Sequence, residues 1–300
     1  MAMTHRKAVA TMVLVTLMWS IAGVVTRHLQ SAAAFEVTFW RSAANAVALG
    51  LLLGWQMGFA ALWRAVRGGG PVLWWSGLCW AVMFTAFMVA MTLTTVANVL
   101  ITMSLAPMFT ALIARFAMGQ RQPARTWVAI VLAGVGIAWM YGSQLGGAQT
   151  TLLGTLVSLT VPMGGSAMWA LAQHNARQHP DVKLDMTPAV LIGAVISSLV
   201  TLPLSVPFVA TVHDVALLVM LGAVQLAIPC VLAVAASRVL KAPEAALLGL
   251  LEILFGVAWT WLGTIEAPTP AVIGGGSLVL VALAGNELLA LLGKRAMPTP

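Results

Sequence analysis

Two ionisable side chains lie well inside long apolar runs of this sequence, where they could bind a charged ligand. Arg41 shares one helical face with Thr38, Ser42 and Asn45, so we expect its guanidinium to point into protein and not at lipid. There it could hold the carboxylate of a ligand through paired hydrogen bonds. The alternative is a structural role, in which Arg41 reaches the water or the helix-end carbonyls at the near end of its run.

Glu252 lies near the middle of a different apolar run. A carboxyl group at that depth could relay a proton or hold the amino group of a ligand. It could equally be a neutral carboxyl group that is bonded to a neighbouring helix. No second acidic residue stands at a matching depth, so the sequence leaves both proton antiport and facilitated diffusion open.

Aromatic and sulfur-containing side chains recur at helical spacing in a third apolar run. Such a face could line an apolar cavity that accepts several kinds of side chain, or it could be an ordinary helix contact. The residues that we expect to bind a substrate are Trp19, Ser20, Arg41, Asn45, Trp80, Met83, Phe84, Phe87, Asn98, Thr102, Pro162 and Glu252.

The histidines and cysteines form no catalytic or metal-binding pattern in the sequence. All five histidines lie at the ends of apolar runs or between them, while Cys79 and Cys230 stand in separate runs without a CxxC pair. A membrane-embedded enzyme would need converging His, Asp, Glu or Cys side chains at one depth. We therefore expect no enzyme activity, no cofactor and no metal.

The composition predicts a membrane protein. Hydrophobic residues make up 61% of the chain and charged residues 8%, and the mean hydropathy is +0.98. A soluble fold of this length does not need so much apolar sequence. The net charge of +7 would suggest nucleic acid if the basic residues gathered on one soluble face, but they are spread among short loops, so we expect no nucleic-acid partner.

Ten apolar segments are long enough to cross a bilayer, which takes roughly 20 residues each. They are residues 8–28, 36–57, 72–91, 96–116, 126–142, 152–173, 187–206, 214–236, 243–263 and 270–291. If the N-terminus is cytoplasmic, every Lys and Arg except Arg27 and Arg41 lies on the inner side, as the positive-inside rule requires. The sequence thus predicts an all-α integral membrane protein with ten transmembrane helices and both termini in the cytoplasm.

The sequence contains an internal repeat. Residues 97–116 align without a gap to residues 243–262, and residues 14–23 align to residues 156–165. The second match favours keeping the first run as a helix over its removal as a signal peptide. We expect two five-helix repeats, residues 1–145 and 146–300. Because five is odd, the second repeat enters the membrane from the opposite side, which is the inverted-repeat plan of many secondary transporters.

Prolines, glycines and tryptophans suggest how the segments pack. Ser20 to Gly23 and Pro162 to Gly165 occupy matching positions, and each could interrupt its helix beside a binding site or mark close helix packing. Gly50, Gly54 and Gly58 form a doubled GxxxG pattern that would let a neighbouring helix approach. Five tryptophans near segment ends are expected at the membrane surface: Trp74, Trp75, Trp127, Trp259 and Trp261.

Three stretches of the sequence resemble the EamA-type drug/metabolite transporters. They are Met-Trp-Ser at 18–20, LAPMFTALIARFAMGQ from Leu105, and its counterpart LEILFGVAWTWLGTIE from Leu251. Within that superfamily the chain looks most like the YddG-type exporters of aromatic and other hydrophobic amino acids. The resemblance implies ten helices in a five-plus-five inverted repeat, a multi-pass location in a bacterial inner membrane, and export of small metabolites.

The predicted function is that of a single-chain secondary transporter working by alternating access. It would export small metabolites, in particular aromatic and other hydrophobic amino acids, from the cytoplasm. We expect it to function as a monomer with its substrate and the membrane lipids as partners. The alternatives are a facilitative channel-like pore and an exporter of drugs or organic cations.

Overall fold

The computed structural model describes residues 3–117, 119, 123–142, 152–178, 185–237, 239–240, 242–264 and 269–295, and these residues form helices without strands. The elements are α1 (His5–Thr26), α2 (Ala34–Met57), α3 (Phe59–Gly68), α4 (Gly70–Leu93), α5 (Val96–Met103), α6 (Ala106–Phe116), α7 (Ala124–Gly142), α8 (Leu152–Gln178), α9 (Thr187–Thr201), η1 (Leu202–Ser205), α10 (Val212–Met220), η2 (Leu221–Ala227), α11 (Ile228–Ser237), α12 (Ala242–Gly263) and α13 (Pro270–Arg295).

Each predicted apolar segment is helical, with ends within a few residues of the predicted ones. Of the residues that the structure describes, six segments are long and apolar enough to cross a membrane. They are His5–Thr26, Ala34–Met57, Gly70–Leu93, Val96–Phe116, Thr187–Ser205 and Val212–Ala236, and shorter apolar stretches lie in α7, α8, α12 and α13. The chain is thus a multi-pass helical membrane protein, while the count of ten spans stays a prediction.

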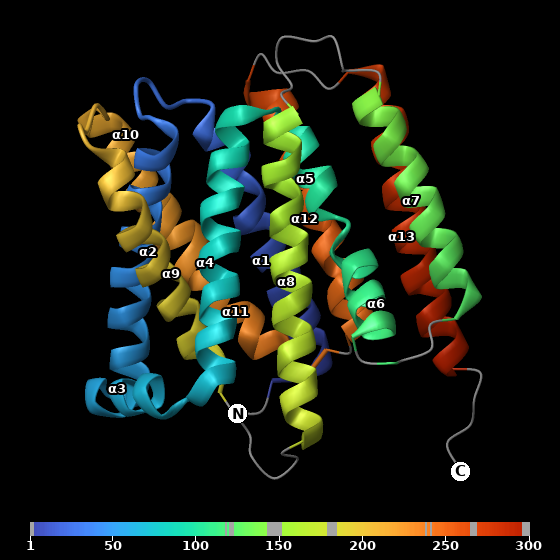
Figure 1. The fold of residues 1–300 in the computed structure, drawn as a ribbon, viewed down its shortest axis with the longest axis horizontal. Coiled ribbons are helices and arrows are strands. Elements are labelled where there is room, and N and C mark those ends of the chain that lie inside the picture. The colour runs from blue at the N-terminus through green and yellow to red at the C-terminus, as the bar shows by residue number, and fades with distance from the viewer. Residues whose placement is uncertain are drawn as a thin grey trace.

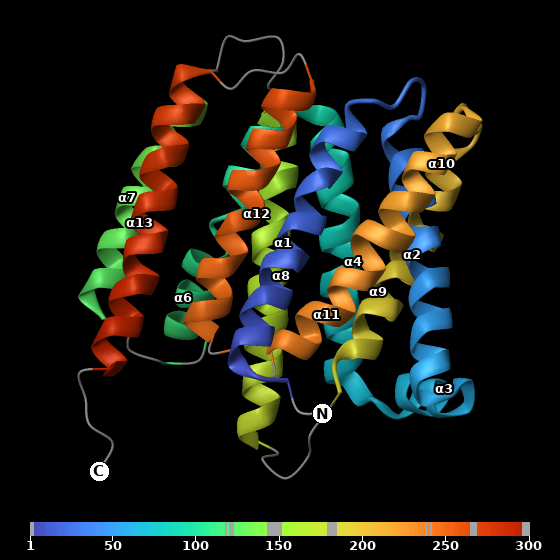
Figure 2. The same cartoon turned by 180° about the vertical axis from the view of Figure 1, so that it is seen from behind.

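The helices pack in pairs along the bundle (Figures 1 and 2). α4 packs against α8 and α9, α1 against α11 and α12, and α2 against α9 and η2. α5 and α6 pack against α8, and α7 and α13 run side by side at one edge of the bundle. The main contacts correspond when the helices of the two predicted repeats are exchanged. The α1–α12 contact corresponds to the contact of α8 with α5 and α6, and the α4–α8 contact corresponds to the α11–α1 contact.

The two ends of the bundle differ in what they contain. α1 begins and α13 ends at the same end, the lower one in Figure 1. We call it the inner end, because the distribution of Lys and Arg predicts that it faces the cytoplasm. The opposite, outer end carries the connections 27–33 and 206–211.

Two of the segments are interrupted, and they are not the ones predicted. The fourth breaks between α5 and α6 at Ser104 and Leu105, and Pro107 follows in the first turn of α6, where proline is tolerated. The eighth contains the π-helix η2 between α10 and α11. The predicted interruptions at Ser20 to Gly23 and Pro162 to Gly165 are wrong, since α1 and α8 are continuous helices through these positions.

Glycines at those positions allow close packing instead. A Cβ at Gly23 would overlap the Val96 side chain, and Gly164 and Gly165 face the side chain of Met83. The doubled GxxxG interpretation is also wrong. Gly50 faces open space, and Gly54 accommodates the Phe59 ring of α3 and not another membrane helix.

Candidate functional site

Arg41 is buried between helices of the two predicted repeats. Its side chain is 3% exposed, so it does not reach water at the end of α2. Nη2 donates a hydrogen bond to Oε1 of Gln225 at 3.2 Å. The guanidinium also lies 5.5 Å from the ring centroid of Phe87 on α4, within the range of a cation–π contact.

Gln225 belongs to η2 and ties three helices together. Its Nε2 donates to the main-chain carbonyl of Trp19 on α1 at 2.8 Å, while its Oε1 accepts from Arg41 on α2. η2 lies directly on α2, because a Cβ at Gly222 would overlap the carbonyl of Arg41, the methyl of Ala44 and the nitrogen of Asn45. The absence of a side chain at position 222 therefore brings Gln225 within reach of Arg41.

Several buried polar atoms around Arg41 have no hydrogen-bond partner among the described residues. They are Nε of Arg41, both side-chain polar atoms of Asn45, and Nε1 of Trp19. Asn45 lies one turn below Arg41 on α2 and is fully buried. Because a buried polar atom without a partner costs free energy, this group of donors and acceptors is well suited to a bound polar ligand.

Glu252 on α12 and Cys230 on α11 lie close enough to Arg41 to interact with it electrostatically. Cys230 is buried next to the indole of Trp19, and Glu252 is part-buried. The arginine and the carboxyl group thus belong to helices of the two different predicted repeats. A zwitterion with one negative and one positive group could bridge them.

Hydroxyl groups extend the polar region towards α9. Oγ of Ser197 lies 2.9 Å from Oγ of Ser42 on α2 and 2.9 Å from Oγ1 of Thr85 on α4. Ser197 and Ser42 are both buried. These three side chains connect α2, α4 and α9 immediately beside Arg41.

The aromatic residues of α4 divide between different neighbours. Trp80 and Phe84 contact one another with ring centroids 5.2 Å apart and pack in a cluster with Leu49 and Cys230. Phe87 faces Arg41, while Met83 packs against α8. The α4 face is therefore partly beside Arg41 and partly an ordinary helix contact.

The other residues predicted to bind a substrate have contacts with residues other than Arg41. Ser20 accepts a hydrogen bond from Nε1 of Trp259 at 3.1 Å, which ties α1 to α12, so Trp259 does more than anchor the chain at the membrane surface. Asn98 and Thr102 are buried in α5. Nδ2 of Asn98 donates to Oγ1 of Thr94, just before α5, and Oγ1 of Thr102 donates to the Asn98 carbonyl. Pro162 is buried in the interior of α8.

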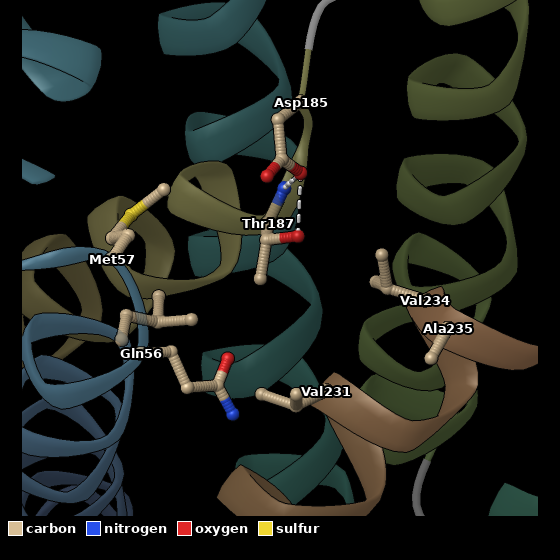
Figure 3. A pocket seen from close by; sticks show the side chains of 8 residues that line it. Gln56, Met57, Asp185, Thr187, Val231, Val234 and Ala235 are labelled. Carbon is tan, nitrogen blue, oxygen red and sulfur yellow. Dashed lines mark hydrogen bonds between the residues drawn. The ribbon is translucent and has the colours of Figure 1, made fainter. Parts of the chain in front are cut away.

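A cavity of about 290 Å³ opens at the inner end, between the end of α2, the start of α9 and α11 (Figure 3). It is lined by Leu53, Gln56, Met57, Asp185, Thr187, Val231, Val234 and Ala235. Asp185 accepts hydrogen bonds from the nitrogen and the hydroxyl of Thr187 at 3.0 and 2.6 Å. Arg41, Asn45, Leu49 and Leu53 occur at every fourth position of α2, so an inclined row of side chains leads from the cavity towards Arg41, a rise of about 18 Å.

The outer end is closed by two fully buried carboxylates. Glu36 at the start of α2 accepts from the nitrogens of Val209 and Ala210 at 3.0 and 2.9 Å. Asp214 at the start of α10 accepts from the nitrogens of Gln30 and Ser31 at 2.8 and 3.1 Å. Each predicted repeat therefore holds a connecting loop of the other, and we call this arrangement the outer clasp.

Comparison with known proteins agrees with a transport role. Residues 6–142 match the EamA-like transporter family. The match supports the EamA superfamily and implies a membrane transporter of small molecules. No curated protein matches the sequence.

The fold of this chain is similar to that of solved structures over nearly its whole length. Sixteen chains of solved structures match the protein. One of them, described only as the crystal structure of a protein, has a TM-score of 0.64 at 17% identity and covers 98% of this chain and 100% of its own. The shared fold therefore includes the second half, which the EamA-like match does not reach.

Residues outside the EamA-like half complete the site, and the sequence analysis missed two of them. Gln225 stands alone as a polar residue in an apolar run, which was the available signal, but the register of an α-helix does not predict its position in a π-helix. Ser197 is the second of these residues. Its contact with Ser42 joins residues far apart in the sequence and has no local signature.

Proposed function

We propose that this protein is a secondary transporter that exports small amphipathic metabolites, in particular aromatic and other hydrophobic amino acids, from the cytoplasm by alternating access. The EamA-like half supports transport of a small molecule. The exchangeable contact pattern of the helices supports two inverted repeats, residues 1–145 and 146–300, with ten spans. The prediction of a monomer in an inner membrane with cytoplasmic termini completes the proposal.

The observation that carries the proposal is the state of Arg41. It is buried in the bundle, where an unbalanced charge is costly. Among the described residues it interacts with a neutral amide, an aromatic ring and a carboxyl group on another helix. A substrate carboxylate would supply the missing acceptor for Nε, together with the negative charge. The guanidinium could then bind it through two parallel hydrogen bonds.

The remaining groups suggest how an amino acid would lie. Its amino group would approach Glu252, and Asn45 would donate to or accept from either end. Its side chain would contact the aromatic face of α4 at Phe87 and Phe84. An apolar side chain gains about 25 cal/mol per Å² of surface removed from water, so this face would favour large hydrophobic amino acids over small polar ones.

Access to the site would be from one side at a time. In this structure the outer clasp holds the outer end together, and the cavity opens at the inner end. Buried Leu49, Leu226 and Cys230 pack in one cluster, and Leu49 lies on α2 between Asn45 and Leu53, which lines the cavity. Loading from the cytoplasm would require this cluster to part, and release would require the clasp to open.

The test is transport of labelled phenylalanine and leucine into proteoliposomes containing the purified protein. We expect saturable uptake that unlabelled substrate on the far side accelerates, whereas a pore would give flux that does not saturate. Arg41→Lys should raise KM about tenfold, because lysine keeps the charge and loses the paired geometry. Normal amino-acid transport by folded Arg41→Ala would overturn the proposed site.

The variant Glu252→Gln distinguishes proton antiport from facilitated diffusion. If Glu252 relays a proton, an imposed pH gradient drives accumulation in the wild type and fails to do so in Glu252→Gln. If the gradient changes nothing at steady state and Glu252→Gln transports normally, transport is facilitated diffusion. Competition by lipophilic organic cations, with none by amino acids, would favour the drug exporter instead.

A further inference from the structure

A short helix lies across the inner end of the bundle and takes no part in the proposed site. α3 (Phe59–Gly68) leaves the axis of α2 at Gly58, which has a φ of 87° that favours glycine, and it runs across the end of the bundle (Figures 1 and 2). Leu62 is 7% exposed, and Val66 packs against buried residues of α4 and α9. One side of α3 is therefore fixed to the protein.

The other side of α3 carries two arginines beside aromatic rings. Trp63 is 57% and Phe59 is 63% exposed, and Arg64 and Arg67 are also exposed. The guanidinium of Arg67 lies 4.5 Å from the centroid of the Trp63 ring. Because residues three and four apart are neighbours on a helix surface, these four side chains form one surface, which we call the α3 patch.

No acidic residue in the neighbouring sequence offsets the charge of the α3 patch. Residues 37–180 contain neither Asp nor Glu. Glu36, the one carboxylate of α2, lies at the opposite end of that helix and accepts from Val209 and Ala210, so α2, α3 and α4 bring no carboxylate towards the patch. Asp185, before α9, accepts its hydrogen bonds from Thr187 and lines the cavity. The two arginines are therefore available to an external anion.

α2, the helix before α3, carries an exposed apolar stripe that indicates which kind of anion the α3 patch would bind. Val47, Leu51 and Trp55 recur at every fourth position of α2 and are 63%, 61% and 84% exposed. This apolar stripe is typical of a surface that faces hydrocarbon, and it descends to the turn at Gly58. An anion that carries hydrocarbon chains would contact both the stripe and the arginines, whereas a soluble anion would contact the arginines alone.

We propose that the α3 patch binds the headgroup of an anionic phospholipid of the inner leaflet. Arg64 and Arg67 hold the phosphate, Trp63 and Phe59 lie at the level of the ester groups, and an acyl chain follows the α2 stripe. Aromatic and basic side chains on a short amphipathic helix are the composition of interfacial membrane contacts. Each arginine contributes roughly a fivefold gain in affinity for an anionic surface.

The experiment is native mass spectrometry of the full-length protein in neutral detergent, titrated separately with phosphatidylglycerol and phosphatidylcholine. The wild type should retain phosphatidylglycerol in preference to phosphatidylcholine. The double variant Arg64→Gln, Arg67→Gln should lose roughly 30-fold in affinity for phosphatidylglycerol, since two arginines are removed. The matched control is Arg115→Gln, an exposed arginine in the last turn of α6 at the same end, which should bind as the wild type does.

Equal retention of phosphatidylglycerol by the double variant and the wild type would overturn the proposal. So would an equal loss in the Arg115→Gln control, which would mean an unspecific effect of net charge. Two measurements on the wild type need no variant. Phosphatidylglycerol should raise the Tm, less so at high salt, and inorganic phosphate should not; stabilisation by phosphate alone would identify a soluble anion and contradict the lipid. Neither result depends on the transported substrate.

Discussion

The side-chain oxygen of Gln225 accepts a hydrogen bond at 3.2 Å from Arg41, a residue of the other half of the chain. The bond joins α2 to η2 in the buried interior of the bundle. Nη2 of Arg41 thus donates to the neutral amide oxygen of Gln225. A substrate carboxylate would accept from the same donor with a charged oxygen. Gln225 therefore acts as an internal stand-in for the ligand that we propose.

Replacing this amide by a carboxylate should inhibit binding. In Gln225→Glu the new carboxylate would pair with Arg41 and compete with the substrate, so we expect KM to rise at least about tenfold, since a charge-assisted bond contributes about 1.5–3 kcal/mol. KM is measured in proteoliposomes, and Tm shows that the variant is folded. A folded Gln225→Glu variant with an unchanged KM would mean that the substrate does not bind at Arg41.

The close approach of η2 to α2 gives a prediction about stability. Gly222→Leu would drive a side chain into the backbone of Arg41 and Asn45, and we expect a loss of about 1–3 kcal/mol in the free energy of unfolding. Gly50→Ala is the matched control. Position 50 faces open space within α2, so alanine there should stabilise by about 0.5–1 kcal/mol. Similar values of Tm for the two variants would contradict the packing described at Gly222.

The sequence predicted the helices better than the site, for a physical reason. A membrane-spanning helix needs a long apolar run, and such runs can be read locally. α3 was missed because it has only ten residues, two of them arginines, and lies between two such runs. Arg41 and Asn45 were predicted correctly to face protein, because the face of a regular helix follows from spacing alone.

The partners of those residues could not be predicted in the same way. Gln225 meets Arg41 only because η2 is a π-helix and Gly222 lacks a side chain. Trp259 was assigned to the membrane surface from its place near a segment end, yet its indole bonds to Ser20. Both contacts depend on how α1, α2 and the later helices cross in space, which local spacing does not determine.

The outer clasp should weaken when one carboxylate is neutralised. Asp214 accepts from the nitrogens of Gln30, Ser31 and Thr211, and Asp214→Asn replaces an acceptor oxygen by a donor. We expect the closed clasp to lose about 2 kcal/mol of stabilising free energy. The rate at which a membrane-impermeant thiol reagent labels Ala210→Cys should therefore rise about tenfold or more.

The labelling background and control follow from the structure. Cys79 and Cys230 are replaced by alanine, so that the introduced thiol is the one that reacts. Thr92→Val is the control, because Thr92 is exposed and its hydroxyl bonds within its own helix, to the Val89 carbonyl. A labelling rate that rises equally in Thr92→Val and Asp214→Asn would assign no special role to the clasp.

Alternating access requires the two ends of the bundle to open in turn. The direct measurement is the labelling rate of a thiol in the inner cavity, Val234→Cys, and of one at the outer clasp, Ala210→Cys, each in the cysteine-free background, as substrate is added. We predict that substrate changes the two rates in opposite directions. Alternating access would be contradicted if both labelling rates rose together, or if neither rate changed at a saturating concentration of a transported substrate.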